Sequence, residues 1–332
     1  MKRFLPDRFT IMLVCTVILA SILPIRGVWA EWFGLATDIA IGLLFFLHGA
    51  RLARETVVAG VLHWRLHLTI VLTTFALFPV LGLALGFIPE SILPAPLYLG
   101  MLFLCVLPST VQSSIAFTSM AGGNVPAAIV AASGSNILGM FLTPALVALL
   151  LSTTGGGGVS ADALQKIALQ LLAPFIVGQI LQPWIGNWIR SKKKILMPVD
   201  RGSILMVVYL AFSTAVMEGI WSTFSVTDIA VVIGLDILLL AVVLCVTMFG
   251  SRALGFSKED EITITFCGSK KSLASGVPMA NAIFAGHSTS IGAIVLPIML
   301  FHQIQLMACA VIAQKYAERL KAKEIAAEPA AA

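Results

Sequence analysis

Ten apolar segments, each close to the length that an α-helix needs to cross a lipid bilayer, occupy most of this sequence. A helix crosses the ~30 Å hydrocarbon core in about 20 residues, and a window of that length selects ten candidates. They cover residues 9–28, 33–50, 67–88, 97–120, 125–151, 165–189, 203–221, 229–250, 262–285 and 290–314. This pattern predicts an all-α polytopic membrane protein with ten transmembrane helices.

The scarcity of charge agrees with this prediction. Charged residues make up 11% of the chain, against roughly 25% in soluble domains. So few charges cannot cover the surface of a soluble protein of 332 residues, and 59% hydrophobic residues exclude a disordered chain. The lipid bilayer is therefore the first partner that we expect. The five cysteines are scattered through apolar segments, so neither a disulfide framework nor a zinc site is expected.

The lysines and arginines predict how the segments are oriented. With the N-terminus in the cytoplasm, 17 of the 21 fall on the cytoplasmic side, and Arg26 and Lys166 fall outside. The other two, Lys270 and Lys271, lie within the ninth segment. This positive-inside bias predicts a cytoplasmic (inner) membrane protein with both termini in the cytoplasm. The net charge of +5 then reflects topology, and we expect no nucleic-acid partner.

A Gly-rich stretch divides the ten segments into two sets of five. We predict a first five-helix repeat at 1–151, a connector at 152–164, a second repeat at 165–315 and a cytoplasmic tail at 316–332. Because five is odd, the two sets enter the membrane in opposite senses, as in inverted-repeat transporters. The basic residues before the first segment also fit a signal peptide, but its removal would leave nine segments, so we predict a retained helix.

Two segments are interrupted near their middle, which is where such transporters place substrates and coupling ions. The interruption in the fourth segment contains Pro108, Ser109, Thr110, Gln112, Ser113 and Ser114. The interruption in the ninth contains Gly268, Ser269, Lys270, Lys271, Ser272, Ser275, Gly276 and Pro278. Proline removes a backbone donor and kinks a helix. The side-chain oxygens can satisfy freed backbone groups or bind an ion.

Lys270 and Lys271 are the most costly residues in these interruptions. A charge at that depth costs ~2.5–3.5 kcal/mol on insertion scales. Neighbours on a helix are about 100° apart, so the two lysines cannot face one partner and we expect different roles. One role is an ion pair with Asp38, Glu218 or Asp236, the carboxyls deepest in apolar segments. The others are replacement of a bound cation, proton coupling and direct binding of an anionic substrate.

Four strings carry a family resemblance: LPSTVQSSIAFTSMAGGNVPAA, VDRGSILMVVY, FCGSKKSLASGVPMAN and VLPIMLFHQIQLM. They resemble the bile acid:sodium symporter family, in particular its branch around sodium/bile acid cotransporter 7 and bacterial relatives. The resemblance covers nearly the whole chain. It implies a panel domain of helices 1, 2, 6 and 7 and a core domain of helices 3–5 and 8–10. In the core, broken helices 4 and 9 cross, and transport proceeds by alternating access as the panel moves against the core.

The sodium-binding motifs of that family carry over only in part. Its fourth-helix pattern, Pro-Gly-Gly-Thr-x-Ser-Asn, is matched by Pro108, Ser113 and Ser114, and its fifth-helix hydroxyls fall near Ser133, Ser135 and Asn136. Thr74 stands where the third helix of the family carries glutamine. The ninth-helix motif, Glu-x-Gly-x-Gln-Asn, becomes Phe-Cys-Gly-Ser-Lys-Lys at 266–271. The resemblance therefore implies weak or absent sodium dependence, with Na⁺ or H⁺ as possible coupling ions and no other cofactor.

We predict a symporter-like secondary transporter for a small organic anion. The alternative is a non-transporting membrane regulator or scaffold of ion homeostasis, which the missing glutamate suggests. An enzyme is not expected, since the sequence has no metal-binding cluster, nucleophile–base pair or phosphate loop. The predicted site residues are Thr74, Pro108, Gln112, Ser113, Ser114, Ser133, Ser135, Asn136, Asp236, Ser269, Lys270, Lys271, Ser272, His302 and Gln303. Substrate identity and oligomeric state are not specified by these residues.

Overall fold

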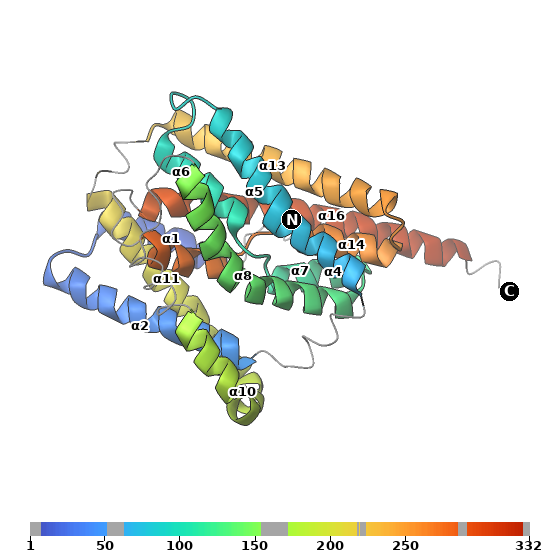
Figure 1. Ribbon diagram of the computed structural model, residues 1–332, viewed down its shortest axis with the longest axis horizontal. Coiled ribbons are helices and arrows are strands. Elements are labelled where there is room, and N and C mark those ends of the chain that lie inside the picture. The colour runs from blue at the N-terminus through green and yellow to red at the C-terminus, as the bar shows by residue number, and fades with distance from the viewer. Residues whose placement is uncertain are drawn as a thin grey trace.

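The computed structural model describes residues 8–51, 63–153, 172–217, 219, 224–284 and 291–327. All regular secondary structure in these ranges is helical, as Figure 1 shows. Five helical stretches there are long and apolar enough to cross a membrane: Val28–Arg51, Trp64–Phe87, Val125–Leu150, Val226–Ala253 and Ile291–Arg319. Ile11–Ile22, Ala95–Val106 and Arg201–Met217 are shorter apolar helices. The chain is thus a helical, multi-pass membrane protein.

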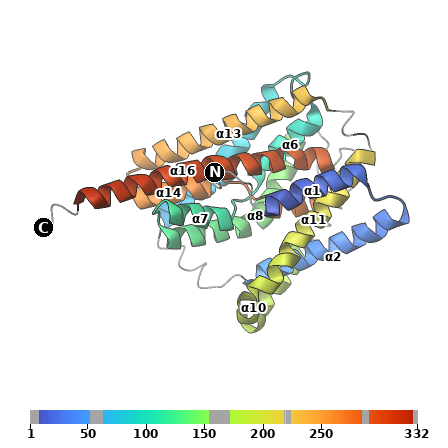
Figure 2. The ribbon, with the colours of Figure 1, turned by 180° about the vertical axis from the view of Figure 1, so that it is seen from behind.

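Four helices pack into a layer on one side of the molecule (Figures 1 and 2). They are α1 (Arg8–Ile22), α2 (Val28–Arg51), α10 (Ala173–Ser191) and α11 (Lys193–Met217). Helices α2 and α10 approach so closely that a Cβ on Gly49 would lie 2.1 Å from the Phe175 carbonyl oxygen. A Cβ on Gly178 would lie 2.2 Å from the Phe46 oxygen. Both positions therefore require glycine, and the two backbones are in contact.

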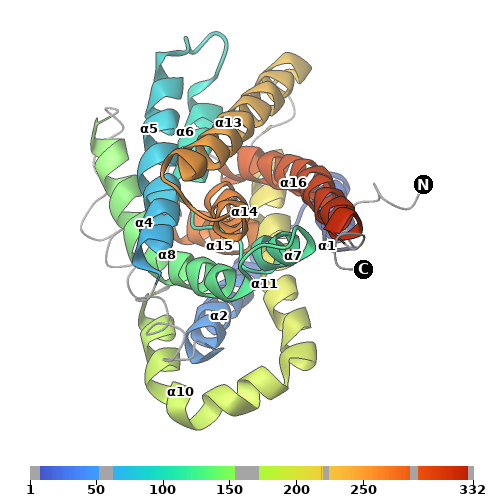
Figure 3. The ribbon, with the colours of Figure 1, turned by 90° about the vertical axis from the view of Figure 1, so that its right-hand side faces the viewer.

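The remaining helices form a second group around the two interrupted segments. A continuous stretch comprises α4 (Trp64–Leu72), the π-helix η2 (Thr73–Leu77), α5 (Phe78–Ala84) and the 3₁₀ turn η3 (Leu85–Phe87). It is joined by α6 (Ala95–Val106), α7 (Gln112–Met120), α8 (Val125–Thr153), α13 (Val226–Ala253), α14 (Lys258–Gly268), α15 (Leu273–Phe284) and α16 (Ile291–Ala327). Figure 3 shows α14 and α15 at the centre of this group.

Both interruptions predicted from the sequence are breaks between helices. Helix α6 ends at Val106 and α7 begins at Gln112, and the extended Leu107 precedes Pro108. Helix α14 ends at Gly268 and α15 begins at Leu273. The inverted relation between the two halves stays a prediction.

The boundaries of some predicted segments differ from those in the structure. The basic run at 192–194 lies between the sixth and seventh predicted segments, where a solvated cytoplasmic loop is expected, but α11 begins at Lys193, so only Lys192 separates it from α10. The predicted third helix is interrupted by the π-helix η2. The Gly-rich connector falls, apart from its first two residues, outside the described residues, as do Lys166 and Glu218.

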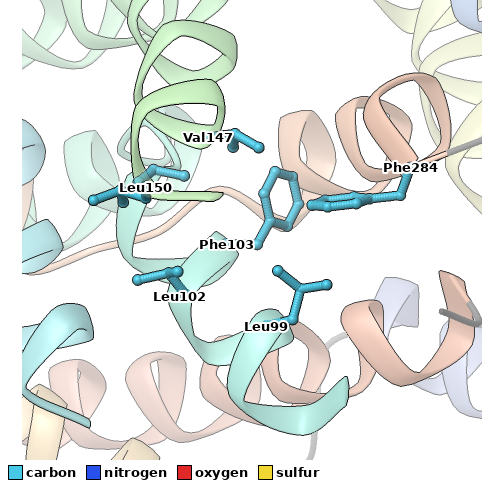
Figure 4. Close-up of a pocket in the computed structure, with 7 residues that line it drawn as sticks. Leu99, Leu102, Phe103, Val147, Leu150 and Phe284 are labelled. Carbon is cyan, nitrogen blue, oxygen red and sulfur yellow. The ribbon is translucent and has the colours of Figure 1, made fainter. Parts of the chain in front are cut away.

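A small apolar cavity lies between α6, α8 and α15 (Figure 4). Phe103 and Phe284 meet edge to face across it, with ring centroids 5.3 Å apart. Hydrocarbon side chains make up its lining: Leu99, Leu102, Phe103, Val106, Val147, Leu150 and Phe284. With no polar group in its wall, this cavity cannot select an ion or orient a polar substrate.

Candidate site at the crossing of the broken helices

The two breaks are hydrogen-bonded directly to each other. The backbone N–H of Ser272 donates to the Pro108 carbonyl at 2.8 Å. In the opposite direction, the Ser109 hydroxyl donates to the Cys267 carbonyl at 2.6 Å and the Ser114 hydroxyl to that of Phe266 at 3.1 Å. Serines from the first break therefore satisfy carbonyls at the C-terminal end of α14, which have no donor within their own helix.

The end of α6 has the same need for donors. Within a continuous helix the Cys105 carbonyl would accept from the N–H of Ser109, but that N–H donates to the Ser135 hydroxyl at 3.0 Å. The Thr143 hydroxyl donates to the Val106 carbonyl at 2.8 Å. The carbonyls of Cys105 and Leu107 are left to find a donor elsewhere in the protein.

The π-helix η2 frees a third carbonyl nearby. In a π-helix each carbonyl accepts from the N–H five residues later, and the N–H of Phe78 donates to Thr73 in this way. The corresponding donor for Thr74 would be Pro79, which has no N–H. The Thr74 carbonyl is thus available because one proline follows the wide turn at the right distance.

Lys271 donates to all three of these carbonyls. Its Nζ atom lies 2.8 Å from the oxygens of Thr74, Cys105 and Leu107, which we call the carbonyl cradle. An ammonium has three N–H donors, so the cradle uses all of them. The side chain is 1% exposed. The negative end of the α6 dipole and the Phe78 ring, whose centroid is 4.0 Å from Nζ, add further attraction.

The backbone of Lys271 is held as firmly as its side chain. The Gln305 amide on α16 accepts from the Lys271 N–H at 2.9 Å and donates to its carbonyl at 2.8 Å. The same Nε2 of Gln305 lies 3.0 Å from Nδ1 of His302. His302 therefore contacts the crossing through Gln305, and Gln303 is half-buried on the same helix.

Lys270 points to a different environment. Its Nζ lies 3.8 Å from the centroid of the Phe117 ring and 5.6 Å from that of Phe266. Its one hydrogen bond among the described residues is a long one, 3.4 Å to the Ser113 carbonyl. The ammonium is fully buried but retains donors that no described group accepts. The expectation of different roles for the two lysines therefore has a structural basis.

Neither lysine forms an ion pair within the part of the chain that the structure describes. The salt bridges found there lie elsewhere, so the alternative of an ion pair with Asp38 or Asp236 is not observed. Backbone carbonyls satisfy Lys271 without a second buried charge, whose desolvation would be expensive. The third candidate, Glu218, lies outside the described residues.

Other predicted residues form a polar network on the side of the crossing that faces α8. Asn136 donates to the Ser109 carbonyl at 2.7 Å and accepts from the Ser275 hydroxyl at 2.8 Å. The Ser272 hydroxyl donates to that of Ser275 at 3.1 Å and accepts from its N–H, which caps the start of α15. Ser269 donates back to the Thr265 carbonyl at 2.6 Å.

Gln112, Ser133 and Asp236 take no direct part in this network. Gln112 is exposed at the first turn of α7, and Ser133 is half-buried on α8 without a recorded bond to either break among the described residues. Asp236 is fully buried on α13. Neither of its carboxyl oxygens has a hydrogen-bond partner among the described residues.

A second polar cluster, which the sequence reasoning missed, holds the first turn of α14, just ahead of the ninth apolar segment. The Glu261 carboxyl accepts from Arg252, Lys258 and Tyr316, at distances from 2.6 to 3.1 Å. Burial raises the pKa of Glu261, but the hydrogen bonds from these donors outweigh it and hold the pKa below its ordinary value. The cluster ties α13 and α16 to the helix that carries the second break.

Comparison with known proteins places this arrangement in a family. The model of the SBF-like CPA transporter family matches residues 7–318. The chain belongs to this family. Among its relatives, Uncharacterized protein PA2026 of Pseudomonas aeruginosa is 58% identical over 320 residues, covering 96% of this chain and 95% of the relative. Putative symporter YfeH of Escherichia coli is 50% identical over 328 residues, covering 98% of each chain. Sodium/bile acid cotransporter 7 of Rattus norvegicus is 29% identical over 276 residues, covering 81% and 79%.

For this member of the SBF-like CPA transporter family, the site also contains groups that the sequence reasoning did not select. The carbonyls of Cys105 and Leu107 belong to residues with apolar side chains, so their composition gives no signal. Gln305 is a polar residue within an apolar segment, and nothing in the sequence identifies its partner. Thr143 lies seven residues after Asn136, the last polar residue of the run in the fifth segment, so the sequence pattern did not indicate it.

Proposed function

We propose that this protein is a secondary transporter for a small organic anion, in which Lys271 takes the place of a coupling sodium ion. It would lie in the cytoplasmic membrane with both termini inside, as the distribution of basic residues predicts. The observation that carries the proposal is the carbonyl cradle. Three backbone oxygens at the crossing of two broken helices surround one positive charge, and that charge is covalently attached to the protein.

The cradle does not fit a sodium ion in addition to Lys271. All three of its oxygens already accept from Nζ, and two unit charges 4 Å apart repel by about 4 kcal/mol at an effective dielectric of 20. The ninth-segment carboxylate that could offset this repulsion is replaced by Phe266. The proposed transporter therefore works without sodium at this position.

Lys270 is the proposed contact for the anion. Lys271 has no donor left, whereas Lys270 has one long hydrogen bond and two aromatic neighbours. A carboxylate or sulfonate that reached Lys270 would gain a charge-assisted hydrogen bond without breaking a strong one. Ser113 and the exposed Gln112 on the same side of the break supply further polar groups.

Alternating access would move the layer of α1, α2, α10 and α11, the proposed panel, against the helices around the crossing, the proposed core. The close packing of α2 on α10 favours movement of the panel as one body. Panel and core meet where Asn281 of α15 lies 3.5 Å from Asp38 of α2. The names of two relatives, a putative symporter and a sodium/bile acid cotransporter, are consistent with such transport.

Uptake into proteoliposomes tests the proposal. We would use radiolabelled lactate, benzoate and taurocholate, which span a range of anion sizes, under imposed sodium, proton or zero gradients. We expect uptake of at least one anion, no saturable increase with sodium, and loss of uptake in Lys270→Ala. The exposed Lys315→Ala is the matched control and should transport normally.

The alternative is a non-transporting regulator or scaffold of ion homeostasis. This alternative is supported if no anion enters the proteoliposomes under any gradient and if cells that express Lys270→Ala at the normal level keep the wild-type phenotype. A saturable rise of uptake with sodium would instead refute the proposed role of Lys271.

A further inference from the structure

Asp236 is a buried carboxyl that the proposed function does not yet use. It lies in the middle of the apolar helix α13, between Leu235 and Ile237, and is fully buried. Both of its oxygens lack a hydrogen-bond donor among the described residues, and no salt bridge reaches them there. An ionised carboxylate in such surroundings would be far more expensive than a neutral carboxylic acid. The geometry thus favours the protonated form.

Asp236 lies on a helix that packs against the elements of the crossing. Helix α13 packs against η2, whose Thr74 carbonyl belongs to the cradle, and against α14 and α16. The titratable groups on these described elements include Cys267 and Glu261 on α14 and His302, Cys309 and Tyr316 on α16. None of them is within hydrogen-bond or ion-pair distance of the Asp236 carboxyl.

A metal ion does not fit this position as well as a proton does. A hard cation needs several oxygen ligands, whereas no second oxygen among the described residues is directed at Asp236 by a recorded contact. A proton needs only the carboxyl itself. The charge of Lys271 is attached to the chain and cannot move between compartments. An ion gradient would therefore have to act on the transporter through a mobile charge at another position in the core.

We propose that Asp236 is the proton-binding site through which this transporter is coupled to a pH gradient. On the acidic side the carboxylate takes one proton from water and becomes a carboxylic acid. On the other side the O–H bond breaks, the electron pair stays on the carboxylate and the proton returns to water. This inference rests on the proposed transport function and adds the identity of the coupling ion and its residue.

The first test measures protonation without any substrate. Infrared spectra of the full-length purified protein at neutral pH should contain the carbonyl stretch of a protonated carboxylic acid. That band should be missing in Asp236→Asn and present in Asp236→Glu, which keeps an ionisable group. Asp228→Asn, on the same helix but half-buried with a hydrogen-bonded carboxyl, is the matched control and should keep the band. A wild-type spectrum without the band, or a band unchanged in Asp236→Asn, overturns the proposal.

The second test separates this inference from the proposed function. One pH unit supports up to about tenfold accumulation of a monovalent anion that enters together with one proton. With the same three radiolabelled anions, wild type should approach that ratio under an inward proton gradient. Asp236→Asn should only equilibrate the anion, while its exchange across the membrane without a gradient persists. Equal accumulation by both overturns the role of Asp236 but leaves transport intact. Absence of uptake by wild type defeats the transport proposal, and the infrared result then decides the protonation claim alone.

Discussion

Replacing Lys271 by alanine should convert the carbonyl cradle into a binding site for a free monovalent cation. The change leaves the oxygens of Thr74, Cys105 and Leu107 without a donor. Each unpaired buried acceptor costs about 1–3 kcal/mol, so the three cost about 3–9 kcal/mol. The variant no longer pays to desolvate the Lys271 ammonium, and this offsets the loss by several kcal/mol. We expect a net loss of about 2–4 kcal/mol in the free energy of unfolding.

Ammonium ions should restore much of this loss, because they carry the same donors that Lys271 supplies. A ligand that binds only the folded protein stabilises it by about 1.4 kcal/mol at ten times its Kd. The measurement is the melting temperature of the purified variant with increasing ammonium, sodium or potassium chloride. Choline chloride at equal ionic strength controls for screening, since choline is too large for the space left by one side chain.

The matched variant is Lys270→Ala, which removes the adjacent lysine and leaves the cradle filled. It should show no cation-specific stabilisation, and neither should wild type. The reasoning fails if Lys271→Ala melts with wild type, or if choline raises its melting temperature as much as ammonium does.

Three further predictions concern the groups around the crossing. Gly139→Ala would place a Cβ 2.6 Å from the ring of Pro108 and should lower the free energy of unfolding by about 1–3 kcal/mol. Gly134→Ala, whose Cβ would have no atom within 4 Å, is the control and should be neutral or slightly stabilising. Equal melting temperatures for the two variants would contradict this. Gln305→Leu leaves the Lys271 N–H and carbonyl unpaired, at about 1–3 kcal/mol each, and Gln305→Glu should recover part of the loss because it keeps the acceptor. Glu261→Gln should lower stability by about 1–2 kcal/mol at neutral pH, since its Arg252 and Lys258 partners are half-exposed. Folding lowers the pKa of Glu261, so its contribution to the free energy of unfolding is full above the ordinary value of 4.5 and is lost as the pH falls below it. Denaturant curves of wild type and Glu261→Gln should therefore converge in acid. A gap between them that stays constant with pH would refute the assignment.

The breaks were predictable because their causes lie in the local sequence. Pro108 lacks a backbone donor, and Gly268 begins a run of small and polar residues, so either segment was unfavourable as a continuous helix. The expectation that Lys270 and Lys271 differ rested on the geometry of a continuous helix, whereas both lie in the break between α14 and α15. What surrounds each of them could not be predicted, since it depends on which segments meet in space.

The carbonyl cradle could not be predicted from residue types. Backbone oxygens are present at every position, and a carbonyl becomes available only when its usual donor is missing or engaged elsewhere. For Thr74 the reason is a π-helix followed by Pro79, and for Cys105 it is a bond from Ser109 to a distant serine. The ion pair that was one of the alternatives for Lys271 is not formed, because uncharged carbonyls at the ends of broken helices accept its hydrogen bonds instead.

The attachment of the cradle's charge to the chain has a thermodynamic consequence. A dissolved ion that visits this position equilibrates with whichever compartment is open, and so carries the difference in electrochemical potential between them into the cycle. The ammonium of Lys271 does not exchange with either compartment, so no concentration difference acts on it. Its return to the starting state therefore releases no free energy. The position can hold the two broken helices in register through every step, but it cannot perform work on a solute. Any uphill movement must be driven from another position in the protein.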